Sequence, residues 1–167
     1  MRSLGLDVGD RRTGVAVSDP DGSIAFSLTT IANGNEDKDI DDIIRLAEQY
    51  EAERIVVGLP LSLNGELGPR AKKVMAFAQE LSLRIKQGGL SEVEVKMWDE
   101  RLSTVAAEHM LVEAGGVKRK SQRGTRKKNV KKNYNSSGKD GIDAMAAAFI
   151  LQGFLDSHGE TGQCLAL

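Results

Sequence analysis

Alternating apolar and polar residues predict three short strands within the first 31 residues. Residues 4–8 alternate Leu and Val with Gly and Asp, residues 13–18 (TGVAVS) are rich in β-forming residues, and residues 23–31 form a third run. The segment DPDG at 19–22 separates the last two runs, where proline presets φ and glycine tolerates a positive φ. Because the links are short, the three runs predict an antiparallel meander.

Beyond residue 31, helical and strand patterns alternate along the chain. Apolar residues at i, i+3, i+4 and i+7 predict amphipathic helices, and short apolar or alternating runs predict strands. The last helix is apolar nearly all round and is expected to be deeply buried, with Asp140 as its N-cap. This order predicts an α/β fold with a mixed five-stranded sheet, an antiparallel three-strand meander plus parallel strands, flanked by helices. The predicted helices cover 40–47, 69–85, 104–114 and 142–151, and the further predicted strands cover 54–58 and 93–97.

Length and composition restrict the class of protein. The 167 residues (18.0 kDa) suit one compact domain, expected over 1–157 with a frayed tail at 158–167. The longest apolar run, 144–151, is too short to span a bilayer, and no secretory apolar region is found at the N-terminus. We therefore expect cytoplasmic residence and no membrane partner. Cys164 is the only cysteine, which excludes an intramolecular disulfide and a zinc ribbon.

The net charge of −1 conceals a strong asymmetry. Residues 117–139 contain ten Lys or Arg and no Asp or Glu, which leaves 13 basic against 24 acidic residues elsewhere, a balance of −11. A block of like charge usually stays solvated, so we expect this basic arm to be mobile. It also indicates a polyanionic partner, most often nucleic acid. The candidate contacts in the arm are Lys118, Arg119, Lys120, Arg123, Arg126, Lys127, Lys128, Lys131 and Lys132.

Three carboxylates stand where an acid is locally out of place. Asp7 interrupts an apolar strand, Glu100 follows the end of the strand predicted at 93–97, and Asp143 lies on the first turn of the apolar last helix. Burying an unpaired carboxylate costs several kcal/mol, so each needs a partner. One shared divalent cation would satisfy all three, and oxygen-only ligands favour Mg²⁺ or Mn²⁺ over zinc.

Each acid also has a purely structural alternative. Asp7 could cap a turn, Glu100 could pair with Arg101, and Asp143 could complement the helix dipole. Asp140 lies one helical turn before Asp143 on the same face, which makes it an N-cap or an additional outer metal ligand. The joint occurrence of three such acids at element boundaries of one small domain favours the metal site.

The link between the first two strands carries two adjacent cations. Arg11 and Arg12 follow the acid on the first strand within the glycine-rich segment DVGDRRTG at 7–14. Such a turn can place backbone N–H groups and arginines beside a phosphate. A plain solvated hairpin explains the same residues equally well, so both interpretations stay open.

Four sequence blocks resemble the YqgF/RuvX family. They are LGLDVGDRRTGVAVSD (4–19), IVVGLPLSLNGE (55–66), DERLSTVAAEHML (99–111) and DGIDAMAAAFILQ (140–152), in the order found in the family. The resemblance implies the RNase H-like fold shared with RuvC-type resolvases. It also implies that Asp7, Glu100 and Asp143 form the acidic catalytic set. The segment between the third and fourth blocks is longer and more basic here than in many family members.

The family is described as Holliday junction resolvases and, in bacteria, as pre-16S rRNA nucleases. The implied reaction is metal-assisted hydrolysis of a phosphodiester, with two Mg²⁺ or Mn²⁺ ions held by the acidic set. The first functional hypothesis is maturation of the 5′ end of 16S rRNA, with the rRNA precursor or a ribosomal particle as partner. The second is resolution of branched DNA, which requires a symmetric homodimer, whereas the first is compatible with a monomer. The third is a non-catalytic nucleic-acid binder that uses only the basic arm.

Overall fold

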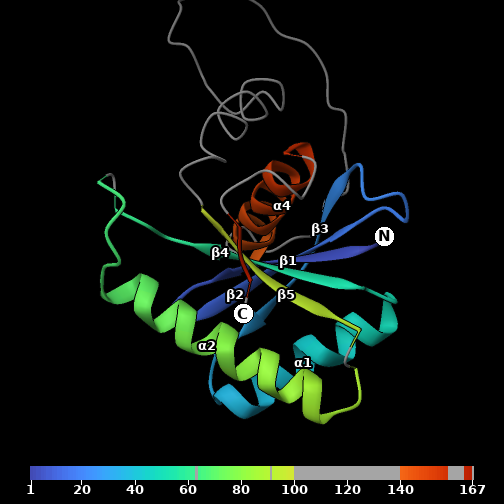
Figure 1. Cartoon of the computed structure of the whole chain (residues 1–167), viewed down its shortest axis with the longest axis horizontal. Helices are drawn as coiled ribbons and strands as arrows, with labels where there is room; N and C mark the ends of the chain where they lie inside the picture. Colours follow the sequence, from blue (N-terminus) through green and yellow to red (C-terminus); the bar gives the residue numbers. More distant parts are fainter. Residues whose placement is uncertain (63, 91, 100–139, 158–163, 167) are drawn as a thin grey trace, which may run out of the picture.

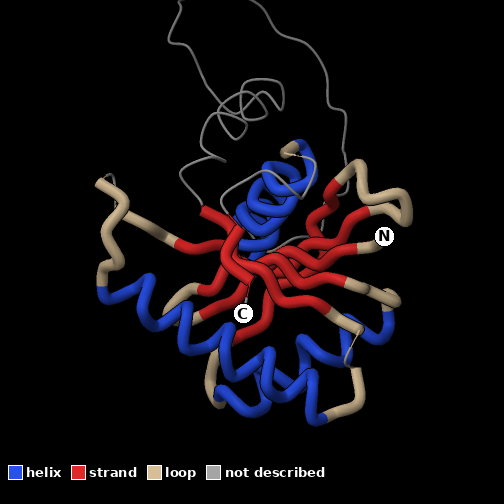
Figure 2. Tube along the Cα trace, in the orientation of Figure 1, coloured by secondary structure: helices blue, strands red, loops and turns tan. Residues whose placement is uncertain are grey.

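The computed structural model describes residues 1–62, 64–90, 92–99, 140–157 and 164–166. Its strands are β1 (Ser3–Val8), β2 (Arg12–Ser18), β3 (Ala25–Ala32), β4 (Arg54–Leu59), β5 (Glu94–Asp99) and β6 (Cys164–Ala166). Its helices are α1 (Glu36–Gln49), α2 (Pro69–Gln87) and α4 (Asp140–Asp156). The strands form one sheet in the order β3-β2-β1-β4-β5-β6. The helices α1 and α2 cover one face of this sheet and α4 covers the other, so the molecule has three layers (Figure 1, Figure 2).

Strand pairing confirms the mixed sheet expected from the sequence. β1, β2 and β3 pair antiparallel as a meander, whereas β1 with β4 and β4 with β5 pair parallel. The parallel pairs exist because α1 and α2 return the chain across one face of the sheet before each new strand begins. As a result β1, β4 and β5 all end at the same edge of the sheet, the usual position of ligand sites in α/β folds.

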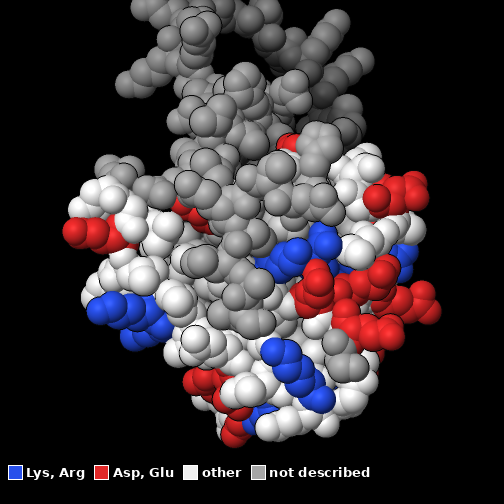
Figure 3. Space-filling model, in the orientation of Figure 1, with Lys and Arg blue, Asp and Glu red and all other residues white. Residues whose placement is uncertain are grey.

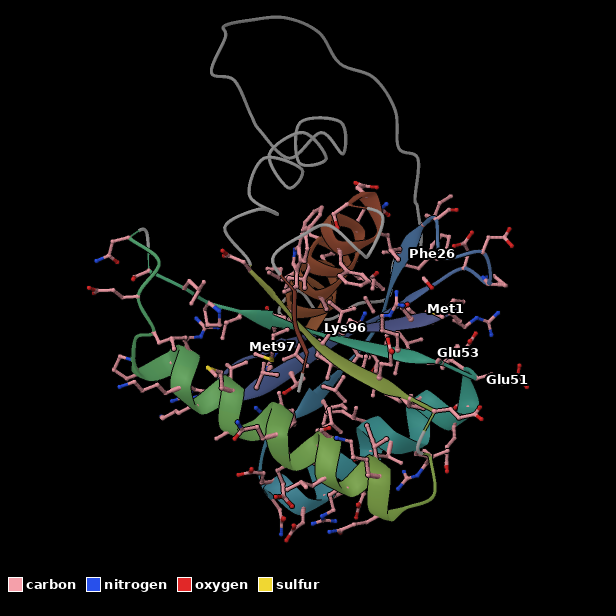
Figure 4. The ribbon with its side chains drawn as sticks, viewed as in Figure 1. Met1, Phe26, Glu51, Glu53, Lys96 and Met97 are labelled. Carbon is pink, nitrogen blue, oxygen red and sulfur yellow. The ribbon has the colours of Figure 1, made fainter. Side chains whose placement is uncertain are left out.

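Side-chain alternation divides the core between the two faces of the sheet. Leu4 and Leu6 of β1 are fully buried in the larger cluster with α1 and α2, and Met97 of β5 joins them there (Figure 4). On the other face, Trp98 packs edge-to-face against Phe154 of α4, with ring centroids 5.7 Å apart. The odd-numbered residues Gly5 and Asp7 of β1 therefore belong to the face that α4 covers.

Arg84 forms ion pairs between the helices α1 and α2, in addition to their packing in the core. Arg84 of α2 contacts Asp37 and Asp41 of α1, and its Nε lies 3.4 Å from Oε1 of Glu80 one turn earlier. The Arg84 side chain is 29% exposed, but the partner carboxylates are 45–75% exposed, so solvent still screens each pair. The ion pairs join the last turn of α2 to the first half of α1.

The structure differs from the sequence expectations in two places. Residues 164–166 were expected in a frayed tail, but they form β6, which pairs antiparallel with β5 and extends the sheet to six strands. This pairing supplies hydrogen-bond partners along the outer side of β5, which would otherwise be an unpaired edge. The last helix is also less buried than expected, because Ile142 and Met145 of α4 are 62% and 40% exposed.

Two expected segments lie outside the described residues, namely the helix at 104–114 and the basic arm at 117–139. Within the described part of the chain, no helix is both long enough and apolar enough to cross a membrane.

Candidate active site

Asp7 lies near the end of the central strand β1. Its residue is half-buried, and in the antiparallel register it stands opposite Gly14 of β2. The flanking apolar residues Leu6 and Val8 face α1 and α2, so strand alternation turns Asp7 toward α4. The acid that interrupts the apolar pattern of β1 therefore lies on the face of the sheet that α4 covers.

A glycine allows α4 to rest directly on β2 beside Asp7. A Cβ atom built on Gly14 would lie 1.9 Å from the carbonyl oxygen of Asp143 and 3.0 Å from the backbone nitrogen of Ala144. The first turn of α4 therefore touches the backbone of β2, an approach that every side chain other than glycine would prevent. Because Gly14 is the register partner of Asp7, this contact brings Asp143 next to Asp7.

The charges around Asp7 act in opposite directions. Burial raises the pKa of the Asp7 carboxyl above its ordinary value, the nearby Arg70 guanidinium lowers it, and Asp143 raises it again. The Asp143 carboxylate is in turn approached by Arg12, whose Nη1 lies 4.0 Å from Oδ2 with both side chains about one-third exposed. Two like charges are thus held together at a half-buried position, an arrangement that a cation would relieve.

The chemistry of the two acids fits a divalent cation with oxygen ligands. Asp7 and Asp143 supply carboxylate oxygens from two different elements, which are the ligands that Mg²⁺ and Mn²⁺ prefer. Within the described ranges, no group of three or more His, Cys, Asp or Glu residues comes together as a complete metal site. Glu100 and the Asp140 side chain, the other predicted ligands, lie outside the described residues.

A cleft of about 470 Å³ opens beside the end of β1. Its walls are the turn after β1, the loop from β3 to α1, and the first two turns of α2. Asn33 fixes the first two walls to each other, because its amide donates to the carbonyl oxygen of Gly9 (2.8 Å) and accepts from the hydroxyl of Thr13 (3.0 Å). Arg70 and Lys73 line the third wall. The cleft is therefore a defined surface feature with two cations on its α2 wall and the carboxylates Asp10, Glu36 and Asp39 on its other walls.

The remaining predicted residues have varied positions. Arg11 is exposed in the turn between β1 and β2, next to Arg12 at the start of β2. Asp99, which directly precedes the predicted Glu100, is buried at the end of β5 and shares with Met97 the face of the sheet opposite Asp7. The predicted cations from Lys118 to Lys132 lie outside the described residues.

Sequence reasoning missed the cations on α2 and the amide of Asn33. Arg70 and Lys73 look like ordinary exposed positions of an amphipathic helix. A usable signal was present, since acids are favoured at the start of a helix and here the first turn has cations and no acid. Asn33 gives no comparable signal, because its role depends on two partners that are distant in sequence.

One family model and many curated proteins match this chain over nearly its whole length. The family model described as "RuvX: Holliday junction resolvase" matches residues 1–157. Proteins from Clostridium botulinum and Desulforamulus reducens, both described as "Putative pre-16S rRNA nuclease", are 42% and 43% identical over 157 residues. These alignments cover 94% of this chain and 98% of each relative.

Solved structures of lower identity share the architecture. Thermus thermophilus RuvC in complex with a Holliday junction substrate has a TM-score of 0.60 at 14% identity, with 99% of both chains covered. A second Thermus thermophilus RuvC structure has a TM-score of 0.52 at 12% identity over the full length of both chains. At this identity the likeness concerns the fold alone, and it confirms the RNase H-like fold expected from the sequence.

Proposed function

Because this chain belongs to the RuvX family of nucleases, we propose that it is a divalent-metal-dependent endonuclease that matures the 5′ end of pre-16S rRNA in the cytoplasm. The observation that carries this proposal is the pairing of Asp7 with Asp143 at the end of β1. The choice of rRNA rests on the names of the relatives that are 42% and 43% identical. The partner would be the rRNA precursor, free or within a ribosomal particle.

Asp7 and Asp143 would hold the metal ion, Glu100 would complete the acidic set, and Asp140 would serve as an outer ligand. Bound there, Mg²⁺ or Mn²⁺ would acidify an attacking water and neutralise charge on the phosphate. The protein prepares this site by holding two carboxylates together, one of them half-buried, so that a cation is favoured strongly.

The other charged residues have supporting roles in the proposal. Arg12, which lies 4.0 Å from the Asp143 carboxylate at the start of α4, would contact a substrate phosphate bound beside that acid. Arg11, exposed in the adjacent turn, is placed to contact a substrate phosphate. The basic arm at 117–139 would bind the nucleic-acid backbone electrostatically, with little sequence readout.

The test is cleavage of two labelled substrates, a 16S precursor fragment and a synthetic four-way DNA junction, each with Mg²⁺ or Mn²⁺. Wild type is compared with Asp7→Asn and with the matched control Asp21→Asn, which changes an exposed acid in the turn between β2 and β3. We expect metal-dependent cutting of the RNA by wild type and the control, and its loss in Asp7→Asn. Retained cutting by Asp7→Asn would overturn the assignment of the site.

The same experiment decides between the alternatives. The description of the matching family model favours a Holliday junction resolvase as the second candidate, and symmetric cutting of the junction by a homodimer would support it. If both substrates are bound and neither is cut in any form, including within the precursor ribosomal particle, the protein is a non-catalytic nucleic-acid binder.

A further inference from the structure

The start of α2 carries an unusual concentration of positive charge. Its first five residues include Arg70, Lys72 and Lys73, and its first turn contains no acid. The start of α1 is the opposite, with Glu36 and Asp37 in its first turn. Figure 3 shows the resulting blue patch at the left of the molecule, over the beginning of α2. The patch is thus specific to one helix end.

This distribution works against helix stability. The N-terminus of a helix carries a partial positive charge, so cations in the first turn are electrostatically unfavourable at low ionic strength. Exposed positions such as Arg70 and Lys73 would accept an acid without steric conflict. Positions that break a local rule in this way are commonly functional sites.

The two cations that line the cleft are placed beside the Asp7 site. Arg70 and Lys73 lie three residues apart on one face of α2, and the Arg70 guanidinium acts on the Asp7 carboxyl. They share the cleft with Val8 and Gly9, which directly follow Asp7, and with the carboxylates Asp10, Glu36 and Asp39 on the other walls. Nζ of Lys73 lies 4.0 Å from Oδ1 of Asp10, and both side chains are about 80% exposed. Such an exposed pair is weak, so Lys73 can exchange this partner for a phosphate at little cost.

We propose that Arg70 and Lys73 bind backbone phosphates of the nucleic-acid strand that enters the Asp7 site. The cleft provides the room, and the guanidinium of Arg70 provides the forked geometry that suits a phosphate. This inference rests on the proposed function in its choice of ligand, and it adds two residues of the described part of the chain to the predicted contacts at Arg11, Arg12 and the basic arm.

The test measures binding without cleavage. The full-length Asp7→Asn protein is titrated with a fluorescently labelled single-stranded RNA between 0.05 and 1 M salt, and anisotropy gives the affinity. Arg70→Gln, Lys73→Gln and the charge-retaining Arg70→Lys are compared in this background. The control is Lys86→Gln, which removes an exposed cation at the opposite end of α2, about 24 Å away.

The slope of log affinity against log salt is negative, and each lost phosphate contact should reduce its magnitude by about 0.7 for a single strand. Across the twentyfold salt range, that slope corresponds to about eightfold weaker binding at 0.05 M salt. We expect this change for Arg70→Gln and Lys73→Gln, and little change for Lys86→Gln. Arg70→Lys keeps the charge and should keep the salt slope, but it loses the forked contact and should bind more weakly at every salt concentration. Thermal unfolding should show that Arg70→Gln and Lys73→Gln remain folded.

The inference is overturned if Arg70→Gln keeps the salt slope of the parent protein, or if Lys86→Gln reduces RNA affinity as much as Arg70→Gln does. It is also overturned if the parent protein does not bind the RNA at all. Its failure is distinct from failure of the proposed function. Cleavage that depends on Asp7, together with binding that ignores Arg70, would remove this inference alone. Binding that depends on Arg70, without cleavage by the wild type, would remove the nuclease proposal and leave the phosphate contacts.

Discussion

The contact between α4 and β2 at Gly14 can be tested with a single methyl group. In Gly14→Ala the new Cβ would start 1.9 Å from the carbonyl oxygen of Asp143, whereas real Cβ contacts essentially never fall below 3.0 Å. The first turn of α4 must therefore move by at least about 1.1 Å, and by about 1.5 Å to reach the 3.4 Å at which ordinary contact begins. Asp143 moves with it, away from Asp7.

This displacement has two expected consequences. Overpacking of this kind costs about 1–3 kcal/mol, and at this chain length each kcal/mol lowers the unfolding midpoint by about 2–4 °C. A misplacement of about 1 Å within a catalytic constellation can lower activity by about 10²-fold. We therefore expect Gly14→Ala to fold, to melt a few degrees lower, and to lose most of its cleavage activity.

Gly5→Ala is the matched control for this prediction. Its Cβ would meet the same helix on the same face, 2.7 Å from Cβ of Leu151 and 2.9 Å from the carbonyl oxygen of Ala147. The required movement is smaller, and it falls one to two turns beyond Asp143. Thermal unfolding and single-turnover cleavage are measured for both variants. Wild-type stability in Gly14→Ala, or an equal loss of activity in Gly5→Ala, would refute the reasoning.

Two further predictions concern stability. Asp7→Asn should melt higher than wild type at pH 7 in EDTA, because burial raises the folded-state pKa of Asp7 and ionisation is then unfavourable; each kcal/mol released is worth about 2–4 °C. This penalty is absent below the unfolded-state pKa of 3.8 and grows as pH rises through the folded pKa, so a midpoint difference that failed to shrink toward pH 3.5 would contradict it. Arg84→Ala should lower the free energy of unfolding, measured in urea, by about 1–2 kcal/mol, because Arg84 pairs with three carboxylates. Arg45 has a 71%-exposed side chain that pairs only with Asp42 among the described residues, so Arg45→Ala should lower it by at most about 0.5 kcal/mol. Equal losses in the two arginine variants would argue against this difference.

Much of the fold was predictable because local patterns and the global arrangement agree. The structure confirms the strand predicted around Leu4 and Leu6 and the amphipathic helix predicted to begin at Pro69. The acids Asp7 and Asp143 were predictable for the opposite reason, since each conflicts with its apolar surroundings. A conflict of this kind is visible in the sequence before any partner is known.

Other features depend on distance in space. The close approach of Gly14 to Asp143 joins residues far apart in the chain, so the glycine reads locally as one more β-strand position. Arg70 and Lys73 look like ordinary helical surface residues until their place in the cleft beside the end of β1 is known. The strand at Cys164–Ala166 is three residues long and has too little pattern to be distinguished from a tail.

The two edge strands of the described sheet, β6 and β3, are the places where another molecule could add a strand by β-pairing. β6 covers β5, and a three-residue strand offers only a short row of free backbone groups to a neighbouring molecule. β3 forms the other edge with eight residues, and its Phe26 is 54% exposed (Figure 4). An irregularity in its pairing opposite Val15 and Ala16 bends this edge and makes it a poorer template for intermolecular β-pairing. Among the described residues, this irregularity is therefore the feature that protects the longer of the two exposed strand edges from β-pairing with another molecule.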